Sequence, residues 1–192
     1  MLLLRNKVKI KVLEIANLRT GLFAKPLSMG DVVYLQSKHF DEQGNLITIP
    51  HADLNYSDIS EKHLLVPGDV VFASKGSKNF AAVFEGGNFA AVASTSFFVI
   101  RITDSRIIPE YLAWFLNYTN TQEFIKSQAK GTSMPSISIK VIENVEIPLL
   151  TFEEQRMMIQ IAKLRVREKD IINQLQIQKD KKIQIQISKL LK

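Results

Sequence analysis

The C-terminal stretch 152-FEEQRMMIQIAKLRVREKDIINQLQIQKDKKIQIQISKLLK-192 contains neither glycine nor proline. All eight glycines and all six prolines of the chain lie at or before Pro148. Because glycine and proline are the residues that most often break helices, this stretch predicts one long helix. Thr151 is placed to cap it, with Glu154 three residues further on. A continuous helix of this length would extend about 60 Å at 1.5 Å per residue.

The apolar residues of this stretch recur at spacings that place them on one helical face, although the strict heptad slips after Leu175. The residues of this face are Ile161, Leu164, Ile171, Leu175, Ile183, Ile187 and Leu190. A lone helix with such a face needs a partner, and packing back on the body of the same chain is one way to supply it. A body of this size is only about 40 Å across, so we favour a coiled-coil contact with another chain.

Residues 1–150 read as a mixed, strand-rich domain, so the expected fold class is α+β with one long C-terminal helix. Alternating or continuous apolar runs predict strands at residues 8–12, 32–35, 46–49, 70–73, 81–84, 89–92 and 96–102. The turn-like residues 85–88 between two of these runs are typical of a hairpin. Two helices follow, one opened by Pro109 and one with Asn120 as its cap and Glu123 three residues later.

The chain has 192 residues, of which 46% are hydrophobic, and a formal net charge of +6. There is no cysteine, which excludes disulfides, thiolate zinc sites and cysteine nucleophiles. Ten Lys/Arg and five Asp/Glu lie from Glu153 onward, so the predicted helix carries most of the net charge. A basic balance favours polyanionic partners, although a solvated helix face has the same composition. The apolar start Met1–Arg5 is too short for a signal peptide or a membrane span, so we expect a soluble, cytoplasmic protein.

Recognisable catalytic motifs are absent. The sequence has no GxSxG nucleophile, no phosphate-binding P-loop and no Pro-Pro pair of the kind an amino-methyltransferase carries. His39, His51 and His63 lie in turn-like sequence without a metal-binding spacing. The nearest run to a nuclease cluster, residues 180–182, falls in the predicted helix as a solvated face. We therefore expect no catalytic activity, no metal and no cofactor.

Polar loops that carry lysine and glycine are the remaining candidates for a function. Lysine neutralises phosphates, serine and asparagine bond phosphates or base edges, and glycine lets the backbone approach closely. The candidate DNA-binding residues fall in three loops: Ser37 and Lys38; Ser74, Lys75, Gly76, Ser77, Lys78 and Asn79; and Lys130, Thr132 and Ser133. Taken alone, each loop fits an ordinary solvated loop equally well.

These stretches, in this order, resemble the specificity subunits of type I restriction–modification systems. The similar segments cover nearly the whole chain: 12-VLEIA-16 with Gly21, 30-GDVVYL-35 with Phe40 and Gly44, 65-LVPGDVVF-72 before Lys75-Gly76, 94-STSFFVI-100, 109-PEYL-112, 131-GTSMP-135, 147-IPL-149 and Glu154-Gln155. No single motif decides the resemblance, which rests on their order and spacing.

The resemblance implies a target recognition domain at residues 1–150 that binds double-stranded DNA. It implies a helix at residues 151–192 for dimerisation and for docking the methyltransferase subunit. In this family the specificity subunit is itself non-catalytic, and it directs adenine methylation and restriction by the methyltransferase and restriction subunits. A usual subunit has two recognition domains and two antiparallel helices, and each domain reads half of a split target.

One domain and one helix correspond to half of that arrangement. The resemblance therefore implies a homodimer through antiparallel helices that reads a palindromic split target, or a fragment that needs another half. Two other classes stay open at this point. One is a coiled-coil adaptor that binds protein and not DNA, and the other is a cryptic nuclease.

Overall fold

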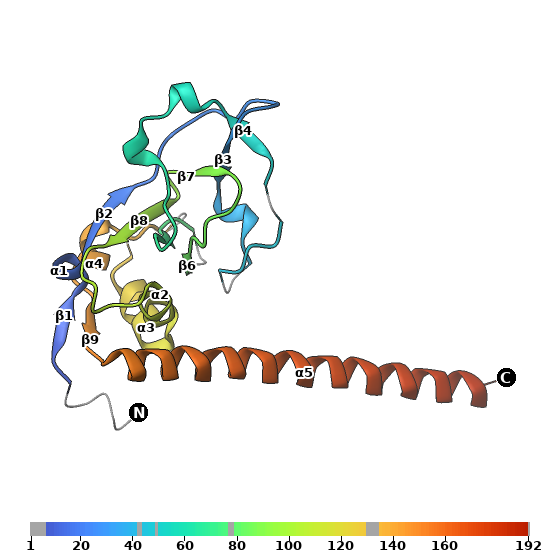
Figure 1. The fold of residues 1–192 in the computed structure, drawn as a ribbon. Coiled ribbons are helices and arrows are strands. Elements are labelled where there is room, and N and C mark those ends of the chain that lie inside the picture. The colour runs from blue at the N-terminus through green and yellow to red at the C-terminus, as the bar shows by residue number, and fades with distance from the viewer. Residues whose placement is uncertain (1–6, 42–43, 49, 77–78, 130–134, 192) are drawn as a thin grey trace. The chain divides into compact units, whose positions relative to one another are not determined.

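The computed structural model describes residues 7–41, 44–48, 50–76, 79–129 and 135–191. The chain divides into two compact units, which are Met1–Phe152 (unit 1) and Glu153–Lys192 (unit 2). All strands described lie in unit 1, and unit 2 consists of the long helix α5 (Figure 1). The expected α+β class, a strand-rich body followed by one long C-terminal helix, is confirmed.

The largest sheet of unit 1 has four strands in the order β2–β8–β5–β6. At its centre β8 (Phe97–Ile102) pairs antiparallel with β2 (Ala16–Thr20) on one side and with β5 (Val70–Ala73) on the other. Beyond β5, the edge strand β6 (Ala81–Val83) pairs antiparallel with it. Every residue of β5 and the first four residues of β8 are buried. This explains why both strands read as continuous apolar runs rather than as alternating ones.

A second sheet has three strands in the order β4–β3–β7. Its central strand β3 (Val32–Leu35) pairs antiparallel with β4 (Ala52–Leu54) and parallel with β7 (Ala90–Ala93). A separate two-stranded ladder joins β1 (Lys9–Lys11) to β9 (Glu146–Pro148), so the beginning and the end of unit 1 lie side by side.

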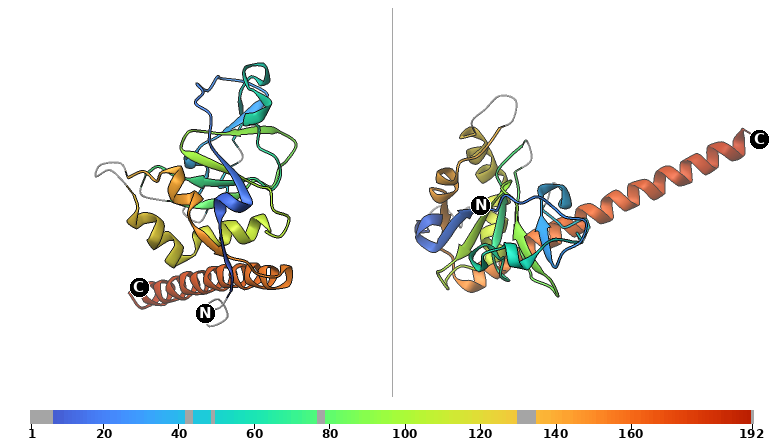
Figure 2. Two further views of the ribbon diagram at one scale, coloured as in Figure 1. Left: turned by 90° about the vertical axis from the view of Figure 1, so that its left-hand side faces the viewer. Right: turned by 90° about the horizontal axis from the view of Figure 1, so that it is seen from above.

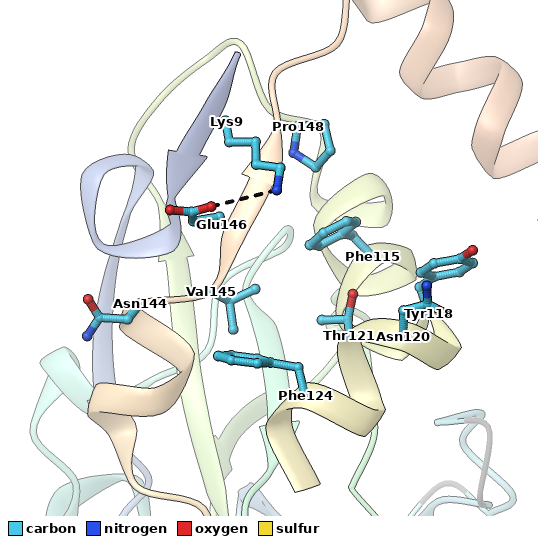
Figure 3. Close-up of a pocket in the computed structure, with 10 residues that line it drawn as sticks. All are labelled: Lys9, Phe115, Tyr118, Asn120, Thr121, Phe124, Asn144, Val145, Glu146 and Pro148. Atoms are coloured by element: carbon cyan, nitrogen blue, oxygen red, sulfur yellow. Dashed lines mark ion pairs between the residues drawn. The ribbon is translucent and has the colours of Figure 1, made fainter. Parts of the chain in front are cut away.

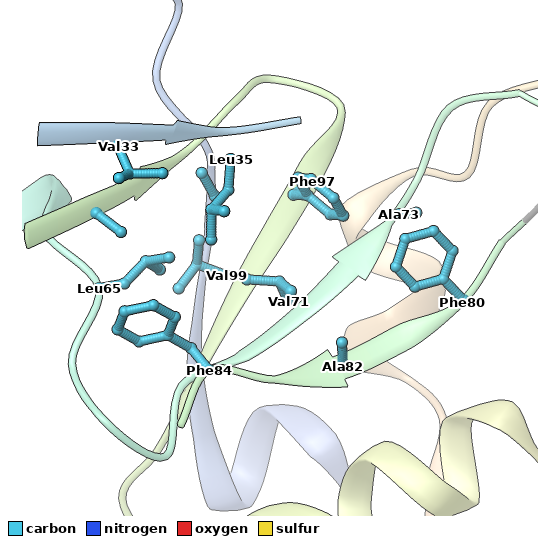
Figure 4. Close-up of a cluster of buried hydrophobic side chains, with 12 residues drawn as sticks. Val33, Leu35, Leu65, Val71, Ala73, Phe80, Ala82, Phe84, Phe97 and Val99 are labelled. Atoms are coloured by element: carbon cyan, nitrogen blue, oxygen red, sulfur yellow. The ribbon is translucent and has the colours of Figure 1, made fainter. Parts of the chain in front are cut away.

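One apolar core fills the space between the two larger sheets (Figure 4). Alternate strand residues point into it, as a pleated strand requires, from β3, β5 and β8. Three rings pack together at one end of this core. The ring of Phe40 lies 5.4 Å from that of Phe80 and 5.7 Å from that of Phe97, and the last two rings are 6.0 Å apart.

Short helices complete unit 1: α1 (Val12–Ile15), α2 (Pro109–Asn117), α3 (Thr119–Ser127), α4 (Ile139–Glu143) and the 3-10 turns η2 (Ser37–His39), η3 (Tyr56–Asp58) and η4 (Glu61–His63). Helix α2 begins at Pro109 as predicted and packs on β6 and β5. Figure 2 shows α2 and α3, in yellow, following one another along one side of unit 1. The predicted cap of α3 was wrong: Tyr118 is the N-cap, and Asn120 lies inside the first turn.

Helix α5 spans Phe152–Leu190, which is 39 residues, and begins directly after Thr151 as predicted. Its acidic residues Glu153 and Glu154 lie in the first turn and its basic residue Lys189 in the last, where each sign complements the helix dipole. All seven residues of the predicted apolar face are exposed, from 44% for Ile161 to 86% for Leu190. Within the described residues, no helix combines the length and the apolar character needed to cross a lipid bilayer.

The expected strand at residues 46–49 was wrong. Leu46 makes only an isolated bridge to Phe40, and Ile49 lies outside the described residues. The partner of β3 is β4 instead, which comes six residues later. There the carboxylate of Asp53 accepts the backbone N–H of Tyr34 at 3.0 Å, beside an irregularity in the ladder. Pairing with β3 therefore outweighed the strand propensity of the earlier residues.

The expected hairpin between residues 81–84 and 89–92 was also wrong. Both segments contain strands, but β6 pairs with β5 and β7 pairs with β3, so they belong to different sheets. Gly86 adopts a positive φ of 85° between them, and it lies against the side chain of Pro67. This glycine turns the chain from one sheet to the other. Among the described residues, β5 and β6 form a hairpin whose strands are joined by residues 74–80.

Candidate nucleic-acid interface

The loop that closes the β5–β6 hairpin contains most of the candidate residues. Ser74 is 2% exposed, and its N–H and Oγ both donate to the carbonyl of Ser96, at 2.8 and 3.1 Å. Asn79 Nδ2 donates to the carbonyl of Ala73 at 2.9 Å, across the base of the loop. These two candidates therefore hold the ends of the loop, while the side chain of Lys75 is exposed. Ser77 and Lys78 lie outside the described residues.

The second candidate loop, residues 130–133, is followed by a segment that pairs with the first loop. Lys130, Thr132 and Ser133 lie outside the described residues, but the chain that follows them is described. Gly76 N–H donates to the carbonyl of Pro135 at 3.0 Å, and Ile137 N–H donates to the carbonyl of Ser74 at 2.8 Å. These bonds make a short antiparallel ladder, so residues 135–137 lie beside residues 74–76.

The third candidate loop meets the same hairpin through the aromatic rings. Ser37 and Lys38 are exposed in the turn η2, and Phe40 follows them. The ring of Phe40 packs on Phe80, which ends the hairpin loop, and on Phe97, which follows the Ser96 that holds Ser74. Two of the predicted loops, and the segment that leaves the third, are thus brought together at one end of the core.

The imidazole of His39 supports the η2 turn in its neutral form. The backbone N–H of Gln36 donates to His39 Nδ1 at 3.2 Å, which requires an unprotonated nitrogen. Burial lowers the pKa of His39 first, and the neighbouring positive charge of Lys38 lowers it further. The carboxylate of Asp53 opposes these effects. The turn that presents Ser37 and Lys38 is therefore built around a neutral histidine.

Arg19 and Arg101, which lie on strands, would be DNA-binding candidates by charge alone. Their side chains instead bind groups of unit 1. Arg101 on β8 donates to both carboxylate oxygens of Asp69, at 2.8 and 2.7 Å, and Asp69 is only 1% exposed. Arg101 and Arg19 also bind the carbonyl of Leu64, at 3.0 and 3.2 Å. The bond to Asp69 raises the pKa of Arg101, whereas burial and then Arg101 lower the pKa of Arg19. These side chains hold residues 64–69 onto the sheet.

Sequence reasoning missed an anchor on the outer edge of β6. Ala81 N–H donates to Asn117 Oδ1 at 2.8 Å, and Asn117 Nδ2 donates back to the Ala81 carbonyl at 2.7 Å. Gly44, with a φ of 83°, approaches the same carbonyl so closely that a Cβ would lie 2.8 Å from its oxygen. An asparagine at the end of a helix gives no signal of this contact in the sequence.

An open groove of about 650 Å³ lies elsewhere on unit 1, between helix α3 and the β1–β9 ladder (Figure 3). Phe115, Phe124 and Val145 supply much of its lining, and the ion pair Lys9–Glu146, with an N–O distance of 3.8 Å, crosses one end. The other polar groups of the lining are hydroxyls and amides. This lining suits contact with another surface better than bond-breaking chemistry.

The histidines belong to no metal-binding group of described residues. His51 is exposed, and the backbone carbonyl of His63 accepts a bond from Arg19 at 3.4 Å. Across the part of the chain that the structure describes, no three His, Cys, Asp or Glu residues are grouped closely enough to hold a metal ion. The described segments that meet are instead those around the β5–β6 hairpin, where residues 135–137 lie beside residues 74–76 and Phe40 packs on Phe80.

The chain is similar to one family of known proteins. Residues 8–186 match the family described as type I restriction modification DNA specificity domain. The chain is 33% identical over 107 residues to the type I restriction enzyme MjaVIII specificity subunit of Methanocaldococcus jannaschii, a match that covers 55% of this chain and 23% of that protein.

Two solved structures share the fold. The type I S subunit from M. genitalium superposes with a TM-score of 0.56 at 17% identity, over 83% of this chain and 39% of that one. The HsdS subunit from Thermoanaerobacter tengcongensis gives a TM-score of 0.59 at 16% identity, over 85% of this chain and 38% of that one. In each case the chain spans well under half of its relative's length.

Proposed function

The chain belongs to the type I restriction-modification DNA specificity family, and from that premise we propose that it is a DNA sequence-recognition subunit. Unit 1 reads double-stranded DNA, and the chain catalyses no reaction itself. Partner methyltransferase and restriction subunits methylate adenine and restrict DNA as this chain directs. The observation that carries the proposal is the meeting of the predicted loops around the β5–β6 hairpin.

The described residues of this region have the chemistry that DNA reading needs. Lys38 and Lys75 are exposed on neighbouring loops, where their charges can pair with phosphates. Behind them, hydrogen bonds of Ser74 and Asn79 hold the two ends of the hairpin loop before DNA binds. A loop whose ends are held in place meets base edges at a lower entropic cost than one whose ends are free to move. The candidates Ser77, Lys78, Lys130, Thr132 and Ser133 extend this surface in the proposal.

The exposed face of α5 supports self-pairing as the working arrangement. Seven apolar side chains of this face, among them Leu164 and Leu175, are at least 44% exposed. Antiparallel pairing with a second copy would cover them. It would also bring Glu153 and Glu154 of one helix toward Lys189 of the other. A two-fold dimer would present two recognition units in inverted orientation and so read a palindromic split target.

A protein-binding adaptor is the second candidate, because the same exposed face of α5 fits a helix of a different protein. The two candidates differ in what unit 1 does. An adaptor needs no contact with DNA at Lys38 or Lys75, and its binding to duplex DNA would show no preference for sequence.

Selection from a pool of randomised duplex DNA tests the proposed function. The full chain, alone and with the methyltransferase subunit of its own system, is used to capture duplexes that are then sequenced. We expect one enriched sequence made of two inverted half-sites around a spacer. No enrichment in either arm would contradict DNA reading. Enrichment of a single half-site would retain DNA reading and contradict the self-paired arrangement.

A further inference from the structure

The backbone geometry of β6 leaves the Ala81 peptide groups without a strand partner. On either side of β6, the backbone bonds to the neighbouring strand: the Phe80 carbonyl accepts Ala73 N–H at 2.8 Å, and Phe84 N–H donates to the backbone carbonyl of Asp69 at 2.8 Å. Ala81 lies out of phase with both, so its N–H and carbonyl point away from β5. Because β6 is an edge strand, nothing in the sheet lies beyond it to receive them.

The side-chain amide of Asn117 occupies that place. It accepts the Ala81 N–H at 2.8 Å and donates to the Ala81 carbonyl at 2.7 Å, as a residue of one more strand would. Asn117 is the last residue of α2, and that helix is held at its other end by Tyr111, whose hydroxyl donates to the Pro148 carbonyl at 2.9 Å. The anchor therefore rests on a helix that is fixed to the body of unit 1.

The anchored residue lies next to the loops of the candidate interface. Ala81 follows Phe80, which is 3% exposed and packs on Phe40 beyond the η2 turn. The Ala81 carbonyl oxygen is also the atom nearest to the place that a Cβ on Gly44 would occupy. Asn117 thus fixes the return arm of the hairpin at a point shared with two other loop segments.

The outgoing arm of the hairpin has a different set of anchors. Ser74 binds Ser96 through its N–H and its hydroxyl, and residues 135–137 pair with residues 74–76. Asn79 joins the two arms through its bond to Ala73. Loss of Asn117 would therefore leave the hairpin attached while freeing one arm to shift.

We propose that Asn117 is a positioning residue for sequence reading: its amide holds the return arm of the β5–β6 hairpin, and so sets where the loop side chains meet base edges. This inference rests on the proposed function. Bonds to bases demand a closer placement than contacts between flexible lysines and phosphates. A shift of the arm should therefore reduce discrimination between sequences more than it reduces total affinity for DNA.

Two substitutions separate this role from general support of the fold. Asn117→Asp keeps an acceptor for the Ala81 N–H but removes the donor and faces the Ala81 carbonyl with a negative oxygen. Asn117→Ala removes both bonds. Asn120→Ala is the matched control, because Asn120 is also exposed and lies only three residues further along.

The readouts are enrichment from the randomised duplex pool, binding to random-sequence duplex, thermal midpoint, and hydrogen exchange at the Ala81 amide. Both Asn117 variants should lose roughly tenfold in enrichment of the preferred sequence, with faster exchange at Ala81 in Asn117→Ala. Binding to random duplex and the thermal midpoint should match those of Asn120→Ala, which keeps full enrichment.

The outcomes distinguish failure of this inference from failure of the proposed function on which it rests. If the parent chain enriches no sequence, the proposed function fails and the inference fails with it. If the parent chain enriches a sequence and both Asn117 variants enrich it equally well, only the inference is overturned. A parallel fall in thermal midpoint and in binding to random duplex would also overturn it, because Asn117 would then support the fold as a whole.

Discussion

Unit 1 and helix α5 use their apolar residues in opposite ways. In unit 1 many large apolar side chains are enclosed, and Phe72 and Phe97 have no exposed surface, although others such as Phe23 are exposed. In α5 the corresponding side chains face outward, with Leu164 64% exposed and Leu190 86% exposed. A helix gains most of its stability in a protein from packing one face against a partner. The core cluster of unit 1 is built from its own residues, whereas the apolar face of α5 is exposed.

The basic side chains of the two regions differ in the same way, because some of those in unit 1 are bonded internally and those of α5 face solvent. Arg19 and Arg101 on the sheet of unit 1 bind internal carbonyl and carboxylate groups. The basic residues of α5, such as Arg165 and Lys181, are exposed. Net charge alone consequently says little about where DNA binds, because much of it lies on the helix and part of the rest is engaged inside unit 1.

Removal of residues 153–192 is the strongest test of this contrast. Because the described core cluster between the two larger sheets is built from residues of unit 1 alone, we expect the truncated chain to stay folded and to lose self-association completely. Light scattering at concentrations on the order of tens of micromolar should find the full chain as a dimer and the truncated chain as a monomer. A monomeric full chain under these conditions would contradict pairing through α5.

Arg101→Ala tests how far unit 1 depends on its internal charges. The substitution leaves the Asp69 carboxylate buried without its bidentate partner. We expect a loss of about 2–3 kcal/mol in the free energy of unfolding of unit 1, since Arg101 is itself partly exposed. Urea unfolding of the truncated chain measures it. Arg106→Ala, which breaks an exposed pair with Asp104, is the control and should leave the unfolding midpoint unchanged.

Lys75→Ala tests whether an exposed lysine of unit 1 contacts DNA, in contrast to Arg101, which is bonded to Asp69. If Lys75 contacts a phosphate, its loss should weaken binding to all duplexes and reduce the salt slope by about 0.9. Lys38→Ala and Lys78→Ala should act alike. The measurement is duplex affinity at several salt concentrations, with Lys140→Ala, an exposed lysine on α4, as the control. A slope equal to that of the control would place the phosphate contacts elsewhere.

The smallest expected effect is a pH dependence from His39. Its pKa is lowered in the folded chain, so the unfolded chain binds the proton more tightly. The stability that His39 contributes is complete above the ordinary value of 6.5, and it falls as the pH drops below that value toward the lowered pKa. Thermal midpoints of unit 1 between roughly pH 7.5 and 5.5 measure this. His39→Gln should decline less steeply than the parent chain, and an equal decline would exclude His39 as the source.

The local elements with continuous signals could be predicted from the sequence. The structure confirms the predicted strands at β3, β5 and β8 and the start of α2 at Pro109. Burial on both faces gives these strands a continuous apolar run, and the proline marks the beginning of the helix. The start of α5 after Thr151 follows from the loss of glycine and proline. These signals are carried by neighbouring residues and do not depend on the rest of the fold.

Elements that depend on distant partners could not be predicted. The strands β2 and β9 and the helices α1 and α4 were missed, because short segments of mixed character form only against the partners that the fold brings to them. The error in pairing residues 81–84 with 89–92 has the same origin. A glycine pair suggests a turn, but the choice between a hairpin and a crossing to another sheet depends on strands far along the chain.

The candidate interface was predicted by residue type and not by arrangement. Lys38 and Lys75 are exposed as a DNA contact requires, whereas Ser74 is buried and supports the loop from within. The bonds that bring the loops together, such as Gly76 to Pro135, join backbone atoms and leave no trace in side-chain chemistry. Asn117 was missed for a related reason, because its role depends on the edge strand that it faces.

Methylation mapping in cells tests the central claim most directly. Methylated adenines are located across the genome of the host that carries this chain, of the same strain without it, and of the strain with it restored. We predict that one split sequence motif loses methylation when the chain is absent and regains it on restoration. An adenine methylation map that stays the same in all three strains would contradict the conclusion that this chain selects a DNA sequence.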